Sequence, residues 1–452
     1  MIDIKLLQKY NVPVPRYTSY PTVPYWKEHI DTNEWEKAFR KQFIKGNAAE
    51  GISLYLHLPF CESLCTYCGC NKKITTNHSV ENVYMDAILK EWHMYTKLME
   101  QKPRLRELHL GGGTPTFFSP KHLKQLLTTI LEDCDLMPGH DFSIEGHPNN
   151  TTIWHLQTLY DLGFRRISYG VQDNNPEVQY VINRIQPFEN VKRATQQARA
   201  IGFTSVNFDL IYGLPLQNVP RITNTIEQCI TLKPDRVAFY SYAHVPWTSK
   251  AQRLFDEHDL PSAEEKMELY LTGKKLFTAA GYSDIGMDHF ALPHDDLYKT
   301  WKSNSLHRNF MGYTTQKTSI LLGLGVSAIS DIGNAFAQNI KTLHDYYTLV
   351  EQNTIPVQKG YFLNSEDIAF RKYILDISCQ GRAIFATEHL SILEKYTFPQ
   401  LQDLASDGLV IYNKSGLQVT ELGQHFIRNI CKAFDLHLLG NGTVDSTFSK
   451  AI

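Results

Sequence analysis

Short runs of β-branched and aromatic residues alternate with amphipathic stretches through the middle of the chain. The runs that predict strands lie at 52–58, 105–110, 141–146, 165–172, 205–213 and 235–244. The stretches that predict helices lie at 80–100, 120–134, 189–202 and 221–232. A strand followed by a helix at such intervals predicts βαβ units around a parallel sheet. Repetition of the unit over roughly 280 residues favours a full or partial TIM-like (β/α) barrel over a Rossmann sheet.

Local signals mark some of the helix ends. Ser119 followed by Pro120 is typical of an N-cap with proline at the first helical position. Gly163 and Gly202 each precede a predicted strand, where glycine commonly ends a helix. The polar and glycine residues also follow the predicted strands, which is the edge where parallel α/β folds bind ligands.

The pattern changes after about residue 360. Residues 366–385, 390–413 and 416–434 predict several helices, and residues 409–420 predict a short hairpin. We therefore expect three regions: an N-terminal segment (1–48) that folds onto the barrel, the barrel itself (49–355), and a helix-rich C-terminal domain (356–452). The last resembles a winged helix, and we expect it to cover the barrel mouth rather than to bind DNA, because it has no basic patch.

Composition narrows the class of protein. The 42% hydrophobic and 20% charged residues are typical of a soluble globular chain. The formal net charge of -2 favours neither nucleic acid nor an anionic membrane surface as a partner. The first residues contain no apolar core of a signal peptide, and no apolar run approaches the roughly 18 residues that span a bilayer. We expect a cytoplasmic protein, and the near-neutral charge with a self-contained barrel favours a monomer.

Four of the eight cysteines lie within ten residues, as Cys61, Cys65, Cys68 and Cys70. The C-x3-C-x2-C-x-C spacing suits a metal clamp better than a disulfide framework. Structural zinc sites usually draw two ligand pairs from two separate turns, and no second pair occurs here. An iron–sulfur cluster is therefore favoured over zinc, with four thiolates or with three and one open iron. The remaining cysteines stand singly in apolar contexts that predict small buried side chains.

A glycine run, Gly111–Gly113, follows the second predicted strand and continues as Thr114-Pro115-Thr116. Such a run lets the backbone approach a ligand closely. It lacks the lysine of a Walker loop and the spacing of a dinucleotide fingerprint, so phosphate binding is not indicated.

Together, the cysteine loop and the glycine turn resemble the radical S-adenosylmethionine (SAM) superfamily. Further motifs in the same order resemble its oxygen-independent coproporphyrinogen III oxidases: PRYTSYPT (15–22), HLPFCESLCTYCGCNK (57–72), LGGGTPT (110–116), SYGVQD (168–173), NFDLIYGLP (207–215), GMDHFALP (286–293), RNFMGYTT (308–315) and GLGVSAIS (323–330). They span nearly the whole chain. The resemblance implies a partial or full barrel of the radical SAM type.

The resemblance also implies site residues. Cys61, Cys65 and Cys68 would hold a [4Fe–4S] cluster, and Cys70, the mark of this branch, would not. SAM at the cluster would contact Tyr55, Tyr67, Gly112, Gly113, Thr114, Glu145 and Ile329. A second SAM would contact Gln172, Arg184, Asp209 and Ala243.

Two positions depart from the family pattern. Gly146-His147 stands where relatives usually have valine-aspartate, and Tyr67 stands where phenylalanine is common. Neither removes an expected ligand of the cluster.

The implied reaction converts two propionates of coproporphyrinogen III to vinyl groups, giving protoporphyrinogen IX for haem biosynthesis without oxygen. A deoxyadenosyl radical from SAM would take a β-hydrogen, and a low-potential donor such as flavodoxin or ferredoxin would supply the electron. Arg16 and Arg308 are candidate partners of the substrate carboxylates, and His289 is a candidate proton carrier. Two alternatives share the scaffold: a haem chaperone, which Cys70 disfavours, and a radical SAM methyltransferase acting on haem.

Overall fold

The computed structural model describes residues 3–247, 249–441 and 448–450 of the chain. Its centre is one large sheet whose strands follow the order β16-β15-β14-β13-β1-β4-β5-β6-β7-β8-β10-β9. In that order the strands are Val357–Phe362, Ala335–Asn339, Ile329–Asp331, Ile320–Leu324, Ile52–Leu58, Arg104–Gly112, Asp135–Gly146, Arg166–Gln172, Ser205–Tyr212, Arg236–Ser241, His289–Ala291 and Ser283–Gly286.

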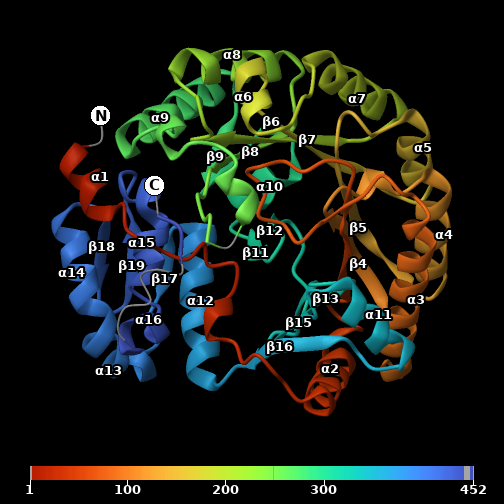
Figure 1. Ribbon diagram of the computed structural model, residues 1–452. Helices are drawn as coiled ribbons and strands as arrows, with labels where there is room; N and C mark the ends of the chain where they lie inside the picture. Colours follow the sequence, from red (N-terminus) through yellow and green to blue (C-terminus); the bar gives the residue numbers. More distant parts are fainter. Residues whose placement is uncertain (1–2, 248, 442–447, 451–452) are drawn as a thin grey trace.

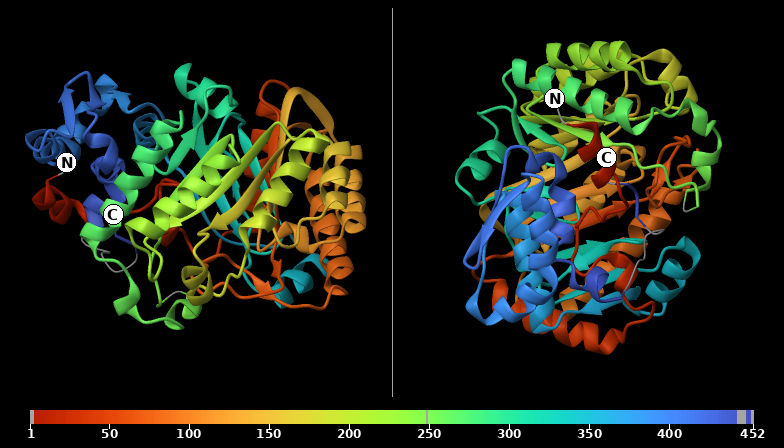
Figure 2. Two further views of the ribbon diagram at one scale, coloured as in Figure 1. Left: turned by 90° about the horizontal axis from the view of Figure 1, so that it is seen from above. Right: turned by 90° about the vertical axis from the view of Figure 1, so that its left-hand side faces the viewer.

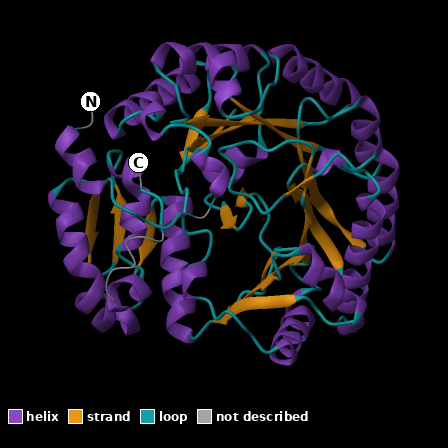
Figure 3. Ribbon diagram, viewed as in Figure 1, coloured by secondary structure: helices purple, strands orange, loops and turns teal. Residues whose placement is uncertain are grey.

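Neighbouring strands from β13 through β1 and β4 to β8 are parallel, whereas the outer strands pair antiparallel. The sheet curves into an arc whose edges, β16 and β9, are not paired with each other among the described residues. Figures 1 and 3 show the strands on the inside of this arc and the helices outside it. The expected parallel (β/α) barrel is therefore confirmed in its partial form.

Helices flank the sheet on its outer face and continue into the last part of the chain. The helices up to β16 are α1 Ile4–Tyr10, α2 Thr32–Gly46, α3 Val80–Leu98, α4 Pro120–Glu132, α5 Ile153–Asp161, α6 Pro176–Val181, α7 Phe188–Ile201, α8 Val219–Thr231, α9 Ala263–Ala279, α10 Asp296–Lys302 and α11 Leu343–Glu351. Ser119 caps α4 through a bond from the His122 amide, and Gly202 ends α7 with a φ of 117°, as expected. Among the described helices, none is long and apolar enough to cross a membrane.

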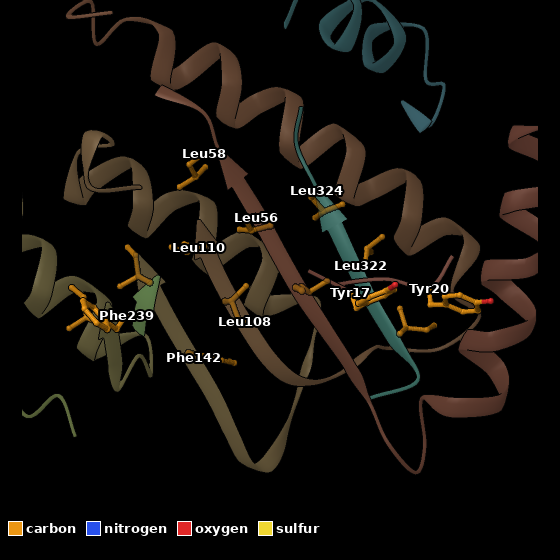
Figure 4. Packing of buried hydrophobic residues seen from close by; sticks show 14 of the residues in the cluster. Tyr17, Tyr20, Leu56, Leu58, Leu108, Leu110, Phe142, Phe239, Leu322 and Leu324 are labelled. Atoms are coloured by element: carbon orange, nitrogen blue, oxygen red, sulfur yellow. The ribbon is translucent and has the colours of Figure 1, made fainter. Parts of the chain in front are cut away.

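Alternation along the strands separates an apolar outer face from a polar inner face. Leu54, Leu56 and Leu58 of β1 are fully buried, and Figure 4 shows Leu56 and Leu58 beside Leu108, Leu110, Leu322 and Leu324 of the adjacent strands. Because successive side chains of a strand point to opposite faces, Tyr55 and His57 lie on the inner face. Burial of each such leucine contributes about 1.5–3 kcal/mol, which sets the register of the strand.

After β16 the chain forms a smaller unit of helices and one three-stranded sheet, ordered β17-β19-β18. Its elements are α12 Ser365–Gln380, β17 Arg382–Ile384, α13 Leu390–Ile392, α14 Phe398–Ser406, β18 Val410–Asn413, β19 Gly416–Val419, α15 Ile427–Lys432 and α16 Leu436–Asn441. The expected hairpin is β18–β19. β16 pairs with β15 in the large sheet, and the first helix of the smaller unit begins at Ser365. The division into three domains stays a prediction.

The N-terminal segment packs against this last unit. The Tyr17 hydroxyl donates to Asp435 over 3.1 Å, and the Tyr20 hydroxyl accepts from the Leu436 amide over 3.1 Å. Pro13 forms an antiparallel bridge with Lys450. Both views of Figure 2 show α1 on the same side of the molecule as the C-terminal helices.

A buried carboxyl group joins α3 to the loop after β13. Glu91 is fully buried and accepts hydrogen bonds from the Tyr346 hydroxyl (2.6 Å), the Asn339 amide (2.7 Å) and the Gly325 backbone (2.8 Å). Burial raises the pKa of Glu91 from 4.5 to about 7, against the opposing effect of these donors. The protonated form therefore favours the folded chain.

This raised pKa predicts a pH dependence of stability. The contribution of protonated Glu91 is present below its unfolded pKa of 4.5 and is lost as pH rises through about 7, which amounts to ~3 kcal/mol in full. The side chain of Glu91→Gln stays neutral at every pH. The free energy of unfolding of the variant minus that of the parent should therefore rise by about 2–3 kcal/mol between pH 5 and pH 8. Urea denaturation at several pH values measures this. A difference that stays constant with pH would contradict the prediction.

Candidate active site

The cysteine loop begins where β1 ends, at the carboxyl edge of the sheet. Two short strands, β2 Phe60–Cys61 and β3 Lys73–Ile74, pair in parallel and close the loop at its base. Cys61, Cys65 and Cys68 are partly buried, whereas Cys70 is exposed. The other four cysteines, Cys134, Cys229, Cys379 and Cys431, are buried, which confirms their expected role as apolar side chains.

Hydrogen bonds from two other segments hold the loop in shape. On one side, the Thr66 amide donates to the Ile182 carbonyl over 3.0 Å, at the end of α6. On the other, Ser249 donates to the Cys68 carbonyl (3.1 Å) and Gln252 donates to the Tyr67 carbonyl (2.9 Å). The loop is thus organised by the protein itself, so little ordering remains to be done when a ligand binds.

Donors surround the thiols. Thr114 donates to the Cys61 sulfur over 3.3 Å, and Arg184 donates to the Cys65 sulfur over 3.6 Å. The pKa of Cys68 is lowered to about 6, chiefly by the hydrogen bond with Cys70 and then by nearby Lys72. Burial raises the pKa of Cys61 to about 11. Such donors stabilise sulfur ligands that carry negative charge.

The thiols fit a cluster better than a single metal ion. Within the part of the chain that the structure describes, no three His, Cys, Asp or Glu side chains converge as ligands of one ion. In a cubane cluster each thiolate binds a different iron, so the sulfurs need not converge on one point. Three partly buried thiols around one rim, with donors beside them, fit a [4Fe–4S] cluster.

A cavity of about 880 Å³ opens beside this loop on the inner face of the sheet. A volume of this size accommodates a drug-sized organic ligand. Its wall includes all four cysteines of the loop and eight of the eleven residues expected to contact SAM: Tyr67, Gly112, Gly113, Thr114, Glu145, Gln172, Arg184 and Asp209. The structure therefore brings together residues that come from β4, β5, β6, β7 and the cysteine loop.

At one end of the cavity, Glu145 lies against the glycine turn. Its carboxylate accepts from the Gly112 amide (3.2 Å) and lies 3.4 Å from His109 Nε2. A Cβ atom on Gly111 would stand 2.9 Å from the Tyr55 ring and 3.1 Å from the Glu145 carboxyl group, so only glycine fits there. The turn thus holds the Glu145 carboxylate at the cavity wall. Its oxygens keep further lone pairs that can accept hydrogen bonds from a ligand.

At the other end, a partly buried carboxyl group and a partly buried guanidinium group face the cavity. Asp209 accepts from Ser168 over 3.1 Å, and burial, followed by the charge of Glu145, raises the pKa of Asp209 to about 7. Arg184 donates to the Gly170 carbonyl over 2.6 Å, but its buried Nε has no hydrogen-bond partner in the described chain. A buried donor without a partner is costly, and a bound ligand would satisfy it.

Three expected contact residues lie outside the cavity wall. Tyr55 donates to His57 Nδ1 (3.1 Å) and stacks on His109 with ring centres 5.9 Å apart. It therefore packs against the histidine that lies beside Glu145. Ala243 follows β8, and its carbonyl accepts from the same Gln252 that holds the cysteine loop. Ile329 in β14 has its backbone over Gly323, which is paired with Tyr55.

The departure at Gly146-His147 forms part of the wall. A Cβ atom on Gly146 would stand 3.1 Å from both Thr151 and Tyr169, so a larger residue would need these neighbours to shift. His147 lines the cavity, and burial together with Arg184 lowers its pKa to about 3. A neutral imidazole therefore faces the cavity at this position.

The remaining candidates lie near the cavity but not in its wall. Arg16 and Arg308 line a second, smaller pocket. His289 is packed between Tyr240 and Tyr313, and burial lowers its pKa to about 3, so it is a neutral side chain near neutral pH.

Sequence patterns did not point to several residues of the site. His57 and His109 alternate with the outward leucines of β1 and β4, and this alternation was a signal that could have found them. Ser249 precedes the short 3-10 helix Lys250–Arg253 and Gln252 lies in it, and a single such turn has no periodic sequence signal.

Comparisons with known proteins agree with this site. Residues 55–229 match the sequence profile of the radical SAM superfamily. The oxygen-independent coproporphyrinogen III oxidase of Escherichia coli is 40% identical over 456 residues, which cover 100% of this chain and 98% of the relative. The protein of that name from Pseudomonas aeruginosa is 37% identical over 444 residues, covering 96% of each chain.

A solved structure is similar along almost the whole chain. The structure of coproporphyrinogen III oxidase from Escherichia coli, described as a radical SAM enzyme, superposes with a TM-score of 0.89 at 37% identity. The match covers 97% of this chain and 99% of the other.

Proposed function

The chain belongs to the oxygen-independent coproporphyrinogen III oxidases of the radical SAM superfamily, and from this we infer its reaction. It converts two propionate side chains of coproporphyrinogen III to vinyl groups and releases two molecules of carbon dioxide, giving protoporphyrinogen IX. The observation that carries this function is the full-length identity of 40% with the Escherichia coli oxidase, together with the cavity beside the cysteine loop.

The residues present fit the cofactors of the family. Cys61, Cys65 and Cys68 would hold the [4Fe–4S] cluster, and the cavity wall from the glycine turn to Asp209 would hold SAM. When bound, these cofactors supply the one-electron chemistry that removes a β-hydrogen from a propionate.

The protein's own part in the reaction is positioning and exclusion of water. Glu145, fixed by the Gly112 amide, offers a carboxylate to an ammonium or hydroxyl group. Arg184 and Asp209 offer a donor and an acceptor at the opposite wall. Holding reacting carbons in register can lower a barrier by about 7–11 kcal/mol, and the partly enclosed cavity keeps water from diverting intermediates.

Other properties follow as proposals. A low-potential protein such as flavodoxin or ferredoxin supplies electrons, and two SAM molecules bind. The protein works as a cytoplasmic monomer without nucleic acid or membrane partners, in keeping with a net charge of -2.

The function is tested with anaerobically reconstituted, reduced protein supplied with SAM and coproporphyrinogen III. We expect release of carbon dioxide, formation of methionine and a divinyl product. Tight haem binding without decarboxylation would support the haem chaperone instead. Transfer of a labelled methyl group from SAM to haem would support the methyltransferase.

A further inference from the structure

A second pocket lies at the same edge of the sheet, between the ends of β7 and β8 and the C-terminal helices. It encloses about 50 Å³. Its wall is formed by Arg16, Tyr212, Ser241, Met267, Tyr270, Met287, Asp288, Arg308, Gln424, His425, Ile427, Arg428 and Asn429. Three separate parts of the chain, namely the N-terminal segment, the barrel and α15, thus contribute to one small pocket.

Charged side chains of both signs line this pocket. Three guanidinium groups, those of Arg16, Arg308 and Arg428, lie in its described wall together with one carboxylate, Asp288, which lies 4.0 Å from Arg16. His425 adds no charge near neutral pH, because burial lowers its pKa to about 4. Guanidinium groups bind carboxylates through charge-assisted hydrogen bonds, so this wall suits an anion.

One guanidinium has a donor left over. Arg308 is 7% exposed, and its buried Nε has no hydrogen-bond partner among the described residues. Other guanidinium donors at this pocket bind the backbone and so have a structural role. Arg428 donates to the carbonyls of Val14 and Pro15. Arg308 Nη2 donates to the Arg16 carbonyl over 3.2 Å. Such a role does not explain the unpartnered Nε, which is the group a bound anion would satisfy.

Size and position indicate what kind of anion fits. A space of about 50 Å³ holds a group the size of a few water molecules, such as a carboxylate, and not a ring system. The pocket adjoins the large cavity through Tyr240, which lines that cavity and lies 6.0 Å below the Arg16 guanidinium. A molecule in the large cavity with a carboxylate on a flexible arm could therefore reach the pocket.

We propose that this pocket binds one propionate carboxylate of the porphyrinogen, with Arg308 and Arg16 as its donors, while the macrocycle lies in the large cavity. The proposal rests on the proposed function. It assigns a substrate-orienting role to residues outside the cavity wall and decides which propionates are held and which are free to react.

Binding of coproporphyrin III, a fluorescent and unreactive porphyrin, tests the proposal without turnover. The parent protein should bind the free acid more tightly than the uncharged tetramethyl ester. In Arg308→Met the affinity for the acid should fall about tenfold or more, with little change for the ester, because one charge-assisted hydrogen bond is lost. In turnover, the loss should appear mainly in KM for coproporphyrinogen III.

Two further variants separate binding from structure. Asp288→Asn removes the carboxylate that competes for the arginines, so it should tighten binding of the acid. If these residues had only a structural role, Arg308→Met and Asp288→Asn would both weaken binding. Arg193→Met, on the exposed face of α7, is the matched control and should leave the affinity at the parent value. Equal affinity of folded Arg308→Met and parent for the acid would overturn the proposal. If the parent binds the acid selectively but does not decarboxylate coproporphyrinogen, the proposed function fails and the pocket assignment stands.

Discussion

Cys61→Ser, Cys65→Ser and Cys68→Ser are each expected to abolish the [4Fe–4S] cluster and, with it, all cleavage of SAM. Each of these thiols is partly buried at the cavity rim, and donors from Thr114 and Arg184 bind two of them. Replacing a thiolate by a hydroxyl removes the sulfur ligand that such clusters require. Iron and sulfide content after anaerobic reconstitution, and methionine release from SAM, measure the loss.

Cys70→Ser is the matched control for this series. Cys70 is exposed and shares a hydrogen bond with Cys68, but it is not one of the three expected ligands. The variant should keep a full complement of iron and sulfide and should still bind SAM. Loss of the cluster in Cys70→Ser as well would show that the division into three ligands and one neighbour is wrong.

Gly113→Ala is expected to disrupt the glycine turn and to abolish SAM binding. A Cβ atom there would stand 2.6 Å from the carbonyl carbon and oxygen of Pro59 and 2.9 Å from the Phe60 oxygen. These are backbone atoms just before Cys61, so the turn and the cysteine loop must move apart. Overpacking of this kind costs about 1–3 kcal/mol of stability. Denaturation of the cluster-free protein and SAM titration of the reconstituted protein measure the two effects.

Gly69→Ala provides the comparison within the cysteine loop itself. Among the described residues other than its two chain neighbours, none has a heavy atom within 4 Å of a Cβ built on Gly69, so the free energy of unfolding should change by less than about 0.5 kcal/mol. If Gly113→Ala unfolds at the same denaturant concentration as Gly69→Ala and binds SAM normally, the close approach of the turn to Pro59 has no consequence.

The parallel core of the fold was predictable because its signal is local. In β1 the alternation of leucines with polar residues identifies both the strand and its inner face, and the glycines after β4 mark the edge where the cavity forms. The first half of β5, Asp135–Gly139, escaped prediction, because it is mostly exposed, contains a proline and a glycine, and is a strand only through pairing with β4. The short edge strands β14 and β9 depend in the same way on neighbours far away in the sequence.

The site was predictable where chemistry restricts the residue type. Thiols at close spacing and glycines at a strand end are informative in themselves, and both are in the cavity wall. Gln252 and Ser249 act through their position alone, since many polar residues could donate to a carbonyl. The same holds for the second pocket, where three arginines meet only because the N-terminal segment and α15 fold against the barrel.

The contact between the N-terminal segment and α15 and α16 has a consequence for synthesis of the chain. Tyr17 is made 418 residues before its partner Asp435, and Tyr20 is made 416 residues before its partner Leu436. At about 5–20 residues per second, the ribosome needs roughly 20–90 s to bring these partners together. The N-terminal segment can therefore take its final place only after the C-terminal helices have been made, and the second pocket, to which both contribute, is completed only then.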